Sequence, residues 1–245
     1  VNALRGDAGG GVTADSNGFT VDPGPLNYFT VSGEPGSTTA GVDLTDPEGA
    51  GDLTVTAYDV YQNVKTDYLG TVQFSTSDPN ANGNVVLNGQ AIPAGNQTDV
   101  GTQYTFVGGD AGVHLFNRNL FTLETAGSRT ITVYDTVQTV VRATTSSINV
   151  LAGGIASFTL TAPDPVQAGI SFSLSVTAAV DAVGNPTNGA VTVTFIDGLG
   201  NHDAPDGTPA TLTNITVVNG VGSGAQTLEL AETLAAGVNA LRGDA

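Results

Sequence analysis

An octapeptide that occurs twice constrains the organisation of this chain more than any other feature. Val-Asn-Ala-Leu-Arg-Gly-Asp-Ala stands at residues 1–8 and again at residues 238–245. Eight identities in register do not arise by chance, so the sequence predicts a tandem array of which the chain covers one period. The alternative is a head-to-tail polymer of separate subunits. In either case the predicted repeat seam comprises Val1, Leu4, Val238 and Leu241.

Short segments of alternating apolar and polar residues, separated by turn residues, run along the chain without helical periodicity. The clearest are residues 52–59, which place Leu53, Val55 and Ala57 on one face, and residues 70–75, which place Val72 and Phe74 on one face. Such strands at this spacing predict an all-β fold built of antiparallel β-sandwiches.

The second half of the chain repeats the plan of the first. A Val-Thr-Ala strand end precedes an Asp-x-x-x-Asn segment at residues 55–63 and again at residues 176–185. The predicted domains are a strand segment at 1–25, one sandwich at 26–150 and a second at 151–245. The second sandwich ends one strand short, and the strand expected at residues 12–21 of a neighbouring unit would complete it. The residues expected to face the neighbouring unit are Val12, Ala14, Phe19 and Val21.

Several segments of the first sandwich resemble a known repeat. They are residues 55–63, 68–79, 104–106, 110–114 and 125–127. Together they resemble the immunoglobulin-like (Ig-like), filamin-type repeats of giant bacterial surface proteins, and residues 156–237 resemble a shorter Ig-like module. The resemblance implies two Ig-like antiparallel β-sandwich domains in tandem, forming a rod-like scaffold outside the cell that has no catalytic residues.

The charge balance excludes several classes of partner. Six basic residues stand against 23 acidic ones, a formal net charge of −17. Because nucleic acids and anionic membranes bind basic patches, neither is an expected partner. No run of about 18 apolar residues predicts membrane insertion. The chain contains no cysteine, so stability must come from packing and strand pairing.

Three acidic segments are candidate calcium sites, although no cofactor is expected to be required. Two are the pairs Asp59 with Asn63 and Asp181 with Asn185, for which an Asx-turn capping backbone N–H groups is the favoured alternative. The third is the oxygen-rich segment 197–207. Its candidate ligands are Asp197, Asn201, Asp203 and Asp206, and a solvated acidic turn is the alternative.

Other motifs give little indication of chemistry. Arg5-Gly6-Asp7 matches an integrin-type tripeptide, but a turn in which Gly6 supplies a positive φ is the favoured interpretation. The two histidines, His114 and His202, are not accompanied by a nucleophile motif. We therefore predict no catalytic residues and no enzyme activity.

The sequence as a whole predicts a structural protein whose partners are copies of itself. We expect an extracellular or cell-surface filament, sheath or stalk, joined by covalent repetition or by strand donation. The alternative function is an adhesin or binding module that recognises a glycan or a host surface through its loops. The loops considered for that role are residues 83–95 and 198–207.

Overall fold

The fold is nearly all β. The computed structural model describes residues 2–44, 53–79, 86–87, 90–91, 103–116, 118, 121–167, 169–196, 211–226 and 240–244. Strands in these ranges form several sheets, mostly antiparallel, and helical structure is limited to 3-10 conformation, as in η1 (Gly108–Asp110) and at Arg118. The predicted all-β fold is therefore confirmed.

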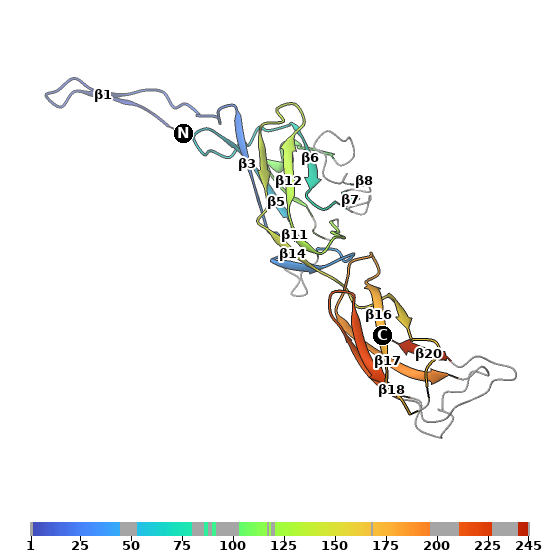
Figure 1. The fold of residues 1–245 in the computed structure, drawn as a ribbon. Helices are drawn as coiled ribbons and strands as arrows, with labels where there is room; N and C mark the ends of the chain where they lie inside the picture. The colour runs from blue at the N-terminus through green and yellow to red at the C-terminus, as the bar shows by residue number, and fades with distance from the viewer. Residues whose placement is uncertain are drawn as a thin grey trace.

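The molecule is elongated and has three parts, which follow each other in chain order (Figure 1). A hairpin of β1 (Arg5–Asp7) and β2 (Thr13–Asp15) projects from one end. The first sheet group, residues 26–151, and the second sheet group, residues 155–244, each surround a hydrophobic cluster of their own.

Three sheets build the first sheet group. The first has the order β10-β5-β3, from Val113–Phe116, Leu53–Asp59 and Leu26–Ser32. The second has the order β13-β12-β6-β9, from Arg142–Thr144, Ile131–Asp135, Thr71–Thr76 and Gln103–Thr105. The third has the order β11-β14-β4, from Gly127–Arg129, Ile148–Leu151 and Ser37–Thr39, and β4 pairs with β14 in parallel. A small pair, β7 (Val86–Leu87) with β8 (Gln90–Ala91), lies beside them.

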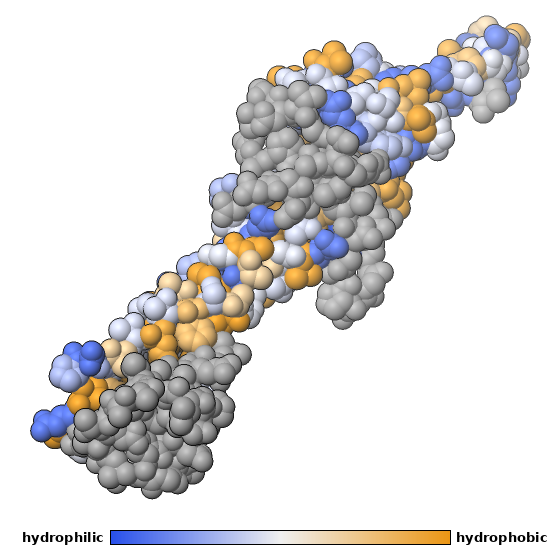
Figure 2. Space-filling view, turned by 90° about the vertical axis from the view of Figure 1, so that its right-hand side faces the viewer, coloured by the Kyte–Doolittle hydropathy of each residue, from blue (hydrophilic) through white to orange (hydrophobic). Residues whose placement is uncertain are grey.

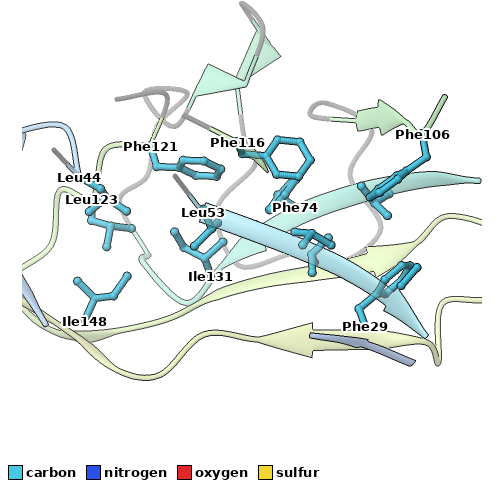
Figure 3. Close-up of a cluster of buried hydrophobic side chains, with 14 of the residues drawn as sticks. Phe29, Leu44, Leu53, Phe74, Phe106, Phe116, Phe121, Leu123, Ile131 and Ile148 are labelled. Atoms are coloured by element: carbon cyan, nitrogen blue, oxygen red, sulfur yellow. The ribbon is translucent and has the colours of Figure 1, made fainter. Parts of the chain in front are cut away.

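The core of the first sheet group follows the alternation of its strands. Leu53, Val55 and Ala57 are all 0% exposed, as are Val72 and Phe74, so both predicted inward faces are confirmed. The cluster gathers side chains from all three sheets (Figure 3), among them Ile131 and Ile148. Phenylalanine rings fill its centre edge to face; for example, the ring centroids of Phe74 and Phe116 lie 4.9 Å apart.

Two sheets build the second sheet group. One has the order β15-β16-β19, from Ser157–Thr161, Phe172–Val180 and Gly222–Gln226. The other has the order β18-β17-β20, from Thr211–Val217, Gly189–Ile196 and Ala240–Asp244. Buried aliphatic residues of β16, β17 and β18 form the cluster between them, with Leu174, Val191, Val193 and Ile215 each 0% exposed.

Several predicted elements differ from the structure. Residues 128–135 alternate as one strand would but form β11 and β12 in two different sheets, and β4 and β13 are too short for alternation to indicate them. The strand expected over residues 12–21 is shorter: β2 spans Thr13–Asp15, and Phe19 pairs separately with Asn2. The turn expected at Gly6 is wrong, because Gly6 lies in β1 opposite Ala14.

Candidate functional site

The N-terminal hairpin is the first candidate site, because it projects from the molecule with both strands exposed (Figure 1). Its turn is made by Gly9, Gly10 and Gly11, which have φ values of 81°, 63° and 81°, a region that glycine enters without steric cost. The hairpin is closed at its base by an antiparallel bridge, in which the N–H of Asn2 donates to the carbonyl oxygen of Phe19 at 3.1 Å and that of Phe19 donates back at 2.9 Å.

This hairpin repeats the main-chain pairing of the terminal hairpin of the first sheet group, residues 129–150, and the hydrogen bonds where that pairing is interrupted. The Leu4 N–H donates to Ser16 Oγ at 3.0 Å, and the Ile131 N–H donates to Thr145 Oγ1 at 3.0 Å. In return, the Ser16 N–H donates to the Leu4 carbonyl at 2.8 Å, and the Thr145 N–H donates to that of Ile131 at 2.9 Å. The two hairpins therefore share one local architecture.

The strand pairing of the two hairpins also agrees in register. Three pairs in β1 and β2 (5 with 15, 6 with 14, 7 with 13) match three pairs in β12 and β13 (132 with 144, 133 with 143, 134 with 142). The bridge of Asn2 with Phe19 matches the pairing of Arg129 with Ile148. In both hairpins the pairing is interrupted between these two sets of pairs. In the first sheet group the interruption marks the point where the chain passes from one sheet to another. Residues 12–21 are divided at the corresponding point, and so they are not one continuous strand.

The two hairpins differ in what covers their apolar residues. In the first sheet group, Val141, Ile148 and Val150 are 7%, 0% and 2% exposed and Ala143 packs against the same cluster. Their counterparts in the N-terminal hairpin are the four residues predicted to face a neighbouring unit. Val12, Phe19 and Val21 are 66%, 38% and 71% exposed, and Ala14 is also exposed.

The first strand of the hairpin shows the same contrast. Leu4 is 68% exposed, whereas its counterpart Ile131 is 0% exposed and points into the core (Figure 3). In the space-filling view the projecting hairpin carries hydrophobic, orange atoms on a narrow stalk (Figure 2). The N-terminal hairpin therefore has the apolar face of a sandwich-completing hairpin without the sandwich.

The described part of the second octapeptide lies in the second sheet group. Its residues 240–244 form β20, which pairs antiparallel with β17 as β12 pairs with β6. Among the described strands, β12 has a second neighbour, β13, whereas β20 has β17 alone. The edge of β20 away from β17 corresponds to the edge of β12 that β13 occupies. Of the predicted seam residues, Leu4 lies in the hairpin and Leu241 in β20; Val1 and Val238 lie outside the described residues.

One ion pair crosses the N-terminal hairpin. Arg5 Nε and Nη2 donate to the two carboxylate oxygens of Asp15 at 2.6 and 2.9 Å. The hydrogen bond from Arg5 lowers the pKa of Asp15, and in return it raises the pKa of Arg5. Because both side chains are more than half exposed, the pair fixes the pairing of two strands more than it stabilises the fold.

The two Asp-x-x-x-Asn segments form a second candidate site, and they are built identically. Asp59 Oδ1 accepts the N–H groups of Tyr61 and Asn63 at 2.8 and 2.9 Å, and its Oδ2 accepts Asn63 Nδ2 and the Gly24 N–H at 2.9 and 2.8 Å. The hydrogen bond from the Asn63 side chain lowers the pKa of Asp59 to about 2, and the backbone donors add to it.

The second segment repeats these four hydrogen bonds. Asp181 accepts from Val183 and Asn185 N–H groups, from Asn185 Nδ2 and from the Gly153 N–H, at 2.8 to 3.1 Å. Burial acts to raise the pKa of Asp181, but the hydrogen bonds from Asn185, Gly153 and Val183 outweigh it, so the pKa is lowered. Both Asp residues act as the Asx-turn interpretation describes.

Calcium binding stays a prediction. Each segment offers one carboxylate whose two oxygens already accept N–H donors. No group of three or more Asp, Glu or His side chains within metal-binding reach occurs in the described ranges. The candidate ligands Asp197, Asn201, Asp203 and Asp206 lie outside those ranges, as do the loops considered for adhesion, apart from residues 86–87 and 90–91.

The segment at Asp181 also joins the two sheet groups, a role that the sequence did not indicate. Asn185 Nδ2 donates to the Glu124 carbonyl at 2.7 Å, and Asn185 Oδ1 accepts the Ala126 N–H at 2.9 Å. Val183 packs against the core cluster of the first sheet group. A Cβ added to Gly41 would lie 3.0 Å from Val183 Cγ1, so glycine is needed there for the close approach.

The comparisons with known proteins give no family assignment. No protein-family model matches the chain, and a search of curated proteins finds no match either. None of the helices in the described part of the chain is long and apolar enough to cross a membrane.

Proposed function

We propose that this chain is one period of an extracellular filament, sheath or stalk, built from Ig-like β-sandwiches joined head to tail. The first sandwich, residues 26–150, is completed by its own hairpin. The second, residues 151–245, is completed by a hairpin whose first strand is β20 and whose second strand has the sequence of residues 12–21. The observation that carries this proposal is the agreement of the two hairpins in hydrogen bonds and register but not in burial.

Covalent continuation accounts for the duplicated octapeptide better than separate subunits do. In a tandem array, β20 would continue through the Gly9–Gly11 turn into the second strand, so each octapeptide is used once. A hairpin donated by another chain would bring its own copy of residues 2–7, and that copy would compete with β20 for the edge of β17. In the tandem array no two strands compete for the same edge.

Burial of the exposed apolar face supplies the driving force. Moving a Leu, Phe or Val side chain out of water contributes about 1.5–3 kcal/mol each. Leu4, Val12, Phe19 and Val21 would gain most, because each is exposed in the hairpin and has a buried counterpart in the first sheet group. Pairing would also cover the open edge of β20, and an uncovered edge is a site of uncontrolled association.

The mechanical role is consistent with the charge and the shape. A formal net charge of −17 would hold neighbouring rods apart in solution and would repel nucleic acids and anionic membranes. The two sheet groups follow one another along the long axis (Figure 1). The partners in this proposal are therefore copies of the same chain, and no catalytic step is involved.

The test is a chain extended beyond Ala245 by the sequence of residues 9–22. Hydrogen exchange of the β20 amides should slow by at least about tenfold relative to the unextended chain, because both edges of β20 are then paired. The matched control carries the same extension with aspartate at the copies of Phe19 and Val21, and its β20 should exchange as in the unextended chain. Equal exchange in all three chains would reject the proposal.

A further inference from the structure

The junction between the two sheet groups has a counterpart at the N-terminal end of the molecule. Gly153 stands three positions after Val150, and Gly24 stands three positions after Val21. Each of these glycines donates its N–H to the Asp of an Asp-x-x-x-Asn segment, Gly153 to Asp181 and Gly24 to Asp59. After each hairpin, the chain therefore makes the same hydrogen bond to the Asp-x-x-x-Asn segment of the sheet group that follows.

The two loops differ in what they contact. Within the chain, Val183 packs on the first sheet group and Asn185 is 6% exposed. Their counterparts Tyr61 and Asn63 are exposed, Tyr61 to 80%. In the described part of the chain, Asn63 bonds through its side chain to Asp59 alone, whereas the side chain of Asn185 makes two further bonds across the junction. The Asp59 loop thus has the structure of the Asp181 loop but none of the contacts that the Asp181 loop makes across the junction in the described residues.

The turn that receives Val183 also has a counterpart in the second sheet group. Val183 lies against Gly41, in a turn where the Val42 N–H donates to the Thr39 carbonyl at 3.1 Å. The Ile170 N–H donates to the Gln167 carbonyl at 3.1 Å in the same kind of turn.

The glycines of the two turns have the same φ in different surroundings. Gly41 and Gly169 both have φ of 74°. A Cβ added at Gly41 would meet Val183, whereas one added at Gly169 meets no atom of the described residues within 4 Å. The turn at Gly169 therefore shares the φ and the hydrogen bond of the turn that receives Val183, and no described residue fills the space beside it. Ile170 beside it is 57% exposed.

We propose that the loop of residues 59–63 docks onto the Gly169 turn of the preceding copy of this chain, with Tyr61 in the place of Val183 and Asn63 in that of Asn185. This inference rests on the proposed head-to-tail array, and it adds that each junction is a fixed joint. The contact is heterologous, since two different surfaces of the same chain meet, and it therefore propagates along the array.

The experiment uses a two-copy chain, residues 1–237 followed by residues 1–245, which contains the shared octapeptide once at the joint. The natural chain has no cysteine, so cysteines at exposed Val218 of the first copy and exposed Leu115 of the second take spin labels specifically. We expect one narrow distance distribution between the labels. Asn63→Ala or Tyr61→Ala in the second copy should broaden it at least twofold. Tyr61→Ala leaves the bonds between Asp59 and Asn63 in place, and so separates docking from loop folding.

The same substitutions in the first copy are the matched control, because no copy precedes it, and they should leave the distribution unchanged. Hydrogen exchange of β20 in the first copy separates the two proposals. Two outcomes with protected β20 amides would overturn the docking and leave strand completion standing. One is a broad distribution of label distances in the unsubstituted chain. The other is a narrow distribution that neither substitution changes. Unprotected β20 amides would overturn the proposed function itself.

Discussion

Two aspartates fix the chain at the start of each sheet group through hydrogen bonds. Asp59 and Asp181 each accept four N–H groups, one of them from a glycine that stands just before the first strand of the sheet group. A carboxylate that accepts several N–H donors stays ionised at low pH. The Asp-x-x-x-Asn spacing predicted the turn but not its consequence, since the donors from Gly24 and Gly153 are 35 and 28 residues away.

The lowered pKa of Asp59 makes a prediction about acid stability. Because the pKa of Asp59 is about 2 in the folded chain, against an ordinary value of 3.8, its contribution is fully present above pH 4 and is lost as the pH falls through about 2. Asp59→Asn should therefore unfold at lower urea concentration than the natural chain at pH 6, and the gap should narrow at pH 2. Urea titrations at both pH values measure it. A gap of constant size would show that the charge of Asp59 is not the cause.

At the scale of the elements, the sequence predicted a completing segment but not how it is built. Counting strands predicted that role for residues 12–21 and for four facing residues, whose counterparts lie in or pack against the core cluster of the first sheet group. The register could not be found, because few residues are identical between the two hairpins and their turns differ by two residues in length. β13 was missed because Arg142–Thr144 is too short to show alternation.

The same elements give a matched pair of substitutions. Ile148→Ala should lower the free energy of unfolding by about 2–5 kcal/mol, because it opens a cavity in the core. Phe19→Ala should change it by less than about 0.5 kcal/mol in the unextended chain, because its side chain is outside any core. Chemical denaturation measures both.

In the chain extended by the sequence of residues 9–22, we expect the alanine substitution of the Phe19 copy to be costly as well. Replacing the copy of Phe19 in the extension by alanine should destabilise the second sheet group by about 3–5 kcal/mol, since that copy is then a core residue. If Phe19→Ala lowers the free energy of unfolding as much in the unextended chain as in the extension, then Phe19 already packs against its own chain and the proposed completion is not needed to bury it.

At the scale of the whole molecule, two junctions built in the same way would make a regular rod. The junction inside the chain is described by the bonds of Asn185 and the packing of Val183. If the junction between copies repeats it, each sandwich would be turned relative to the last by a similar angle. Long arrays of such units extend with each added repeat, because each contacts only its neighbours.

Small-angle scattering of the two-copy chain tests this regularity. Its largest dimension should be roughly twice that of the single chain, as expected for units added end to end. Asn63→Ala in both copies should lower the average dimension by allowing the joint to bend, and Asn185→Ala should do so even in the single chain. A two-copy chain no longer than a single one would mean that the copies fold back side by side.

The exposed face of the N-terminal hairpin has a further consequence for an array of finite length. Every internal hairpin would be covered, but the foremost one would present Leu4, Phe19 and Val21 to water, and at the opposite end β20 would remain half paired. The two extremities are thus chemically unlike, since one exposes an apolar face and the other an unpaired strand edge. A cell that makes such an array must therefore cap it, and terminal repeats are expected to carry polar residues at these three positions or to lack the hairpin altogether.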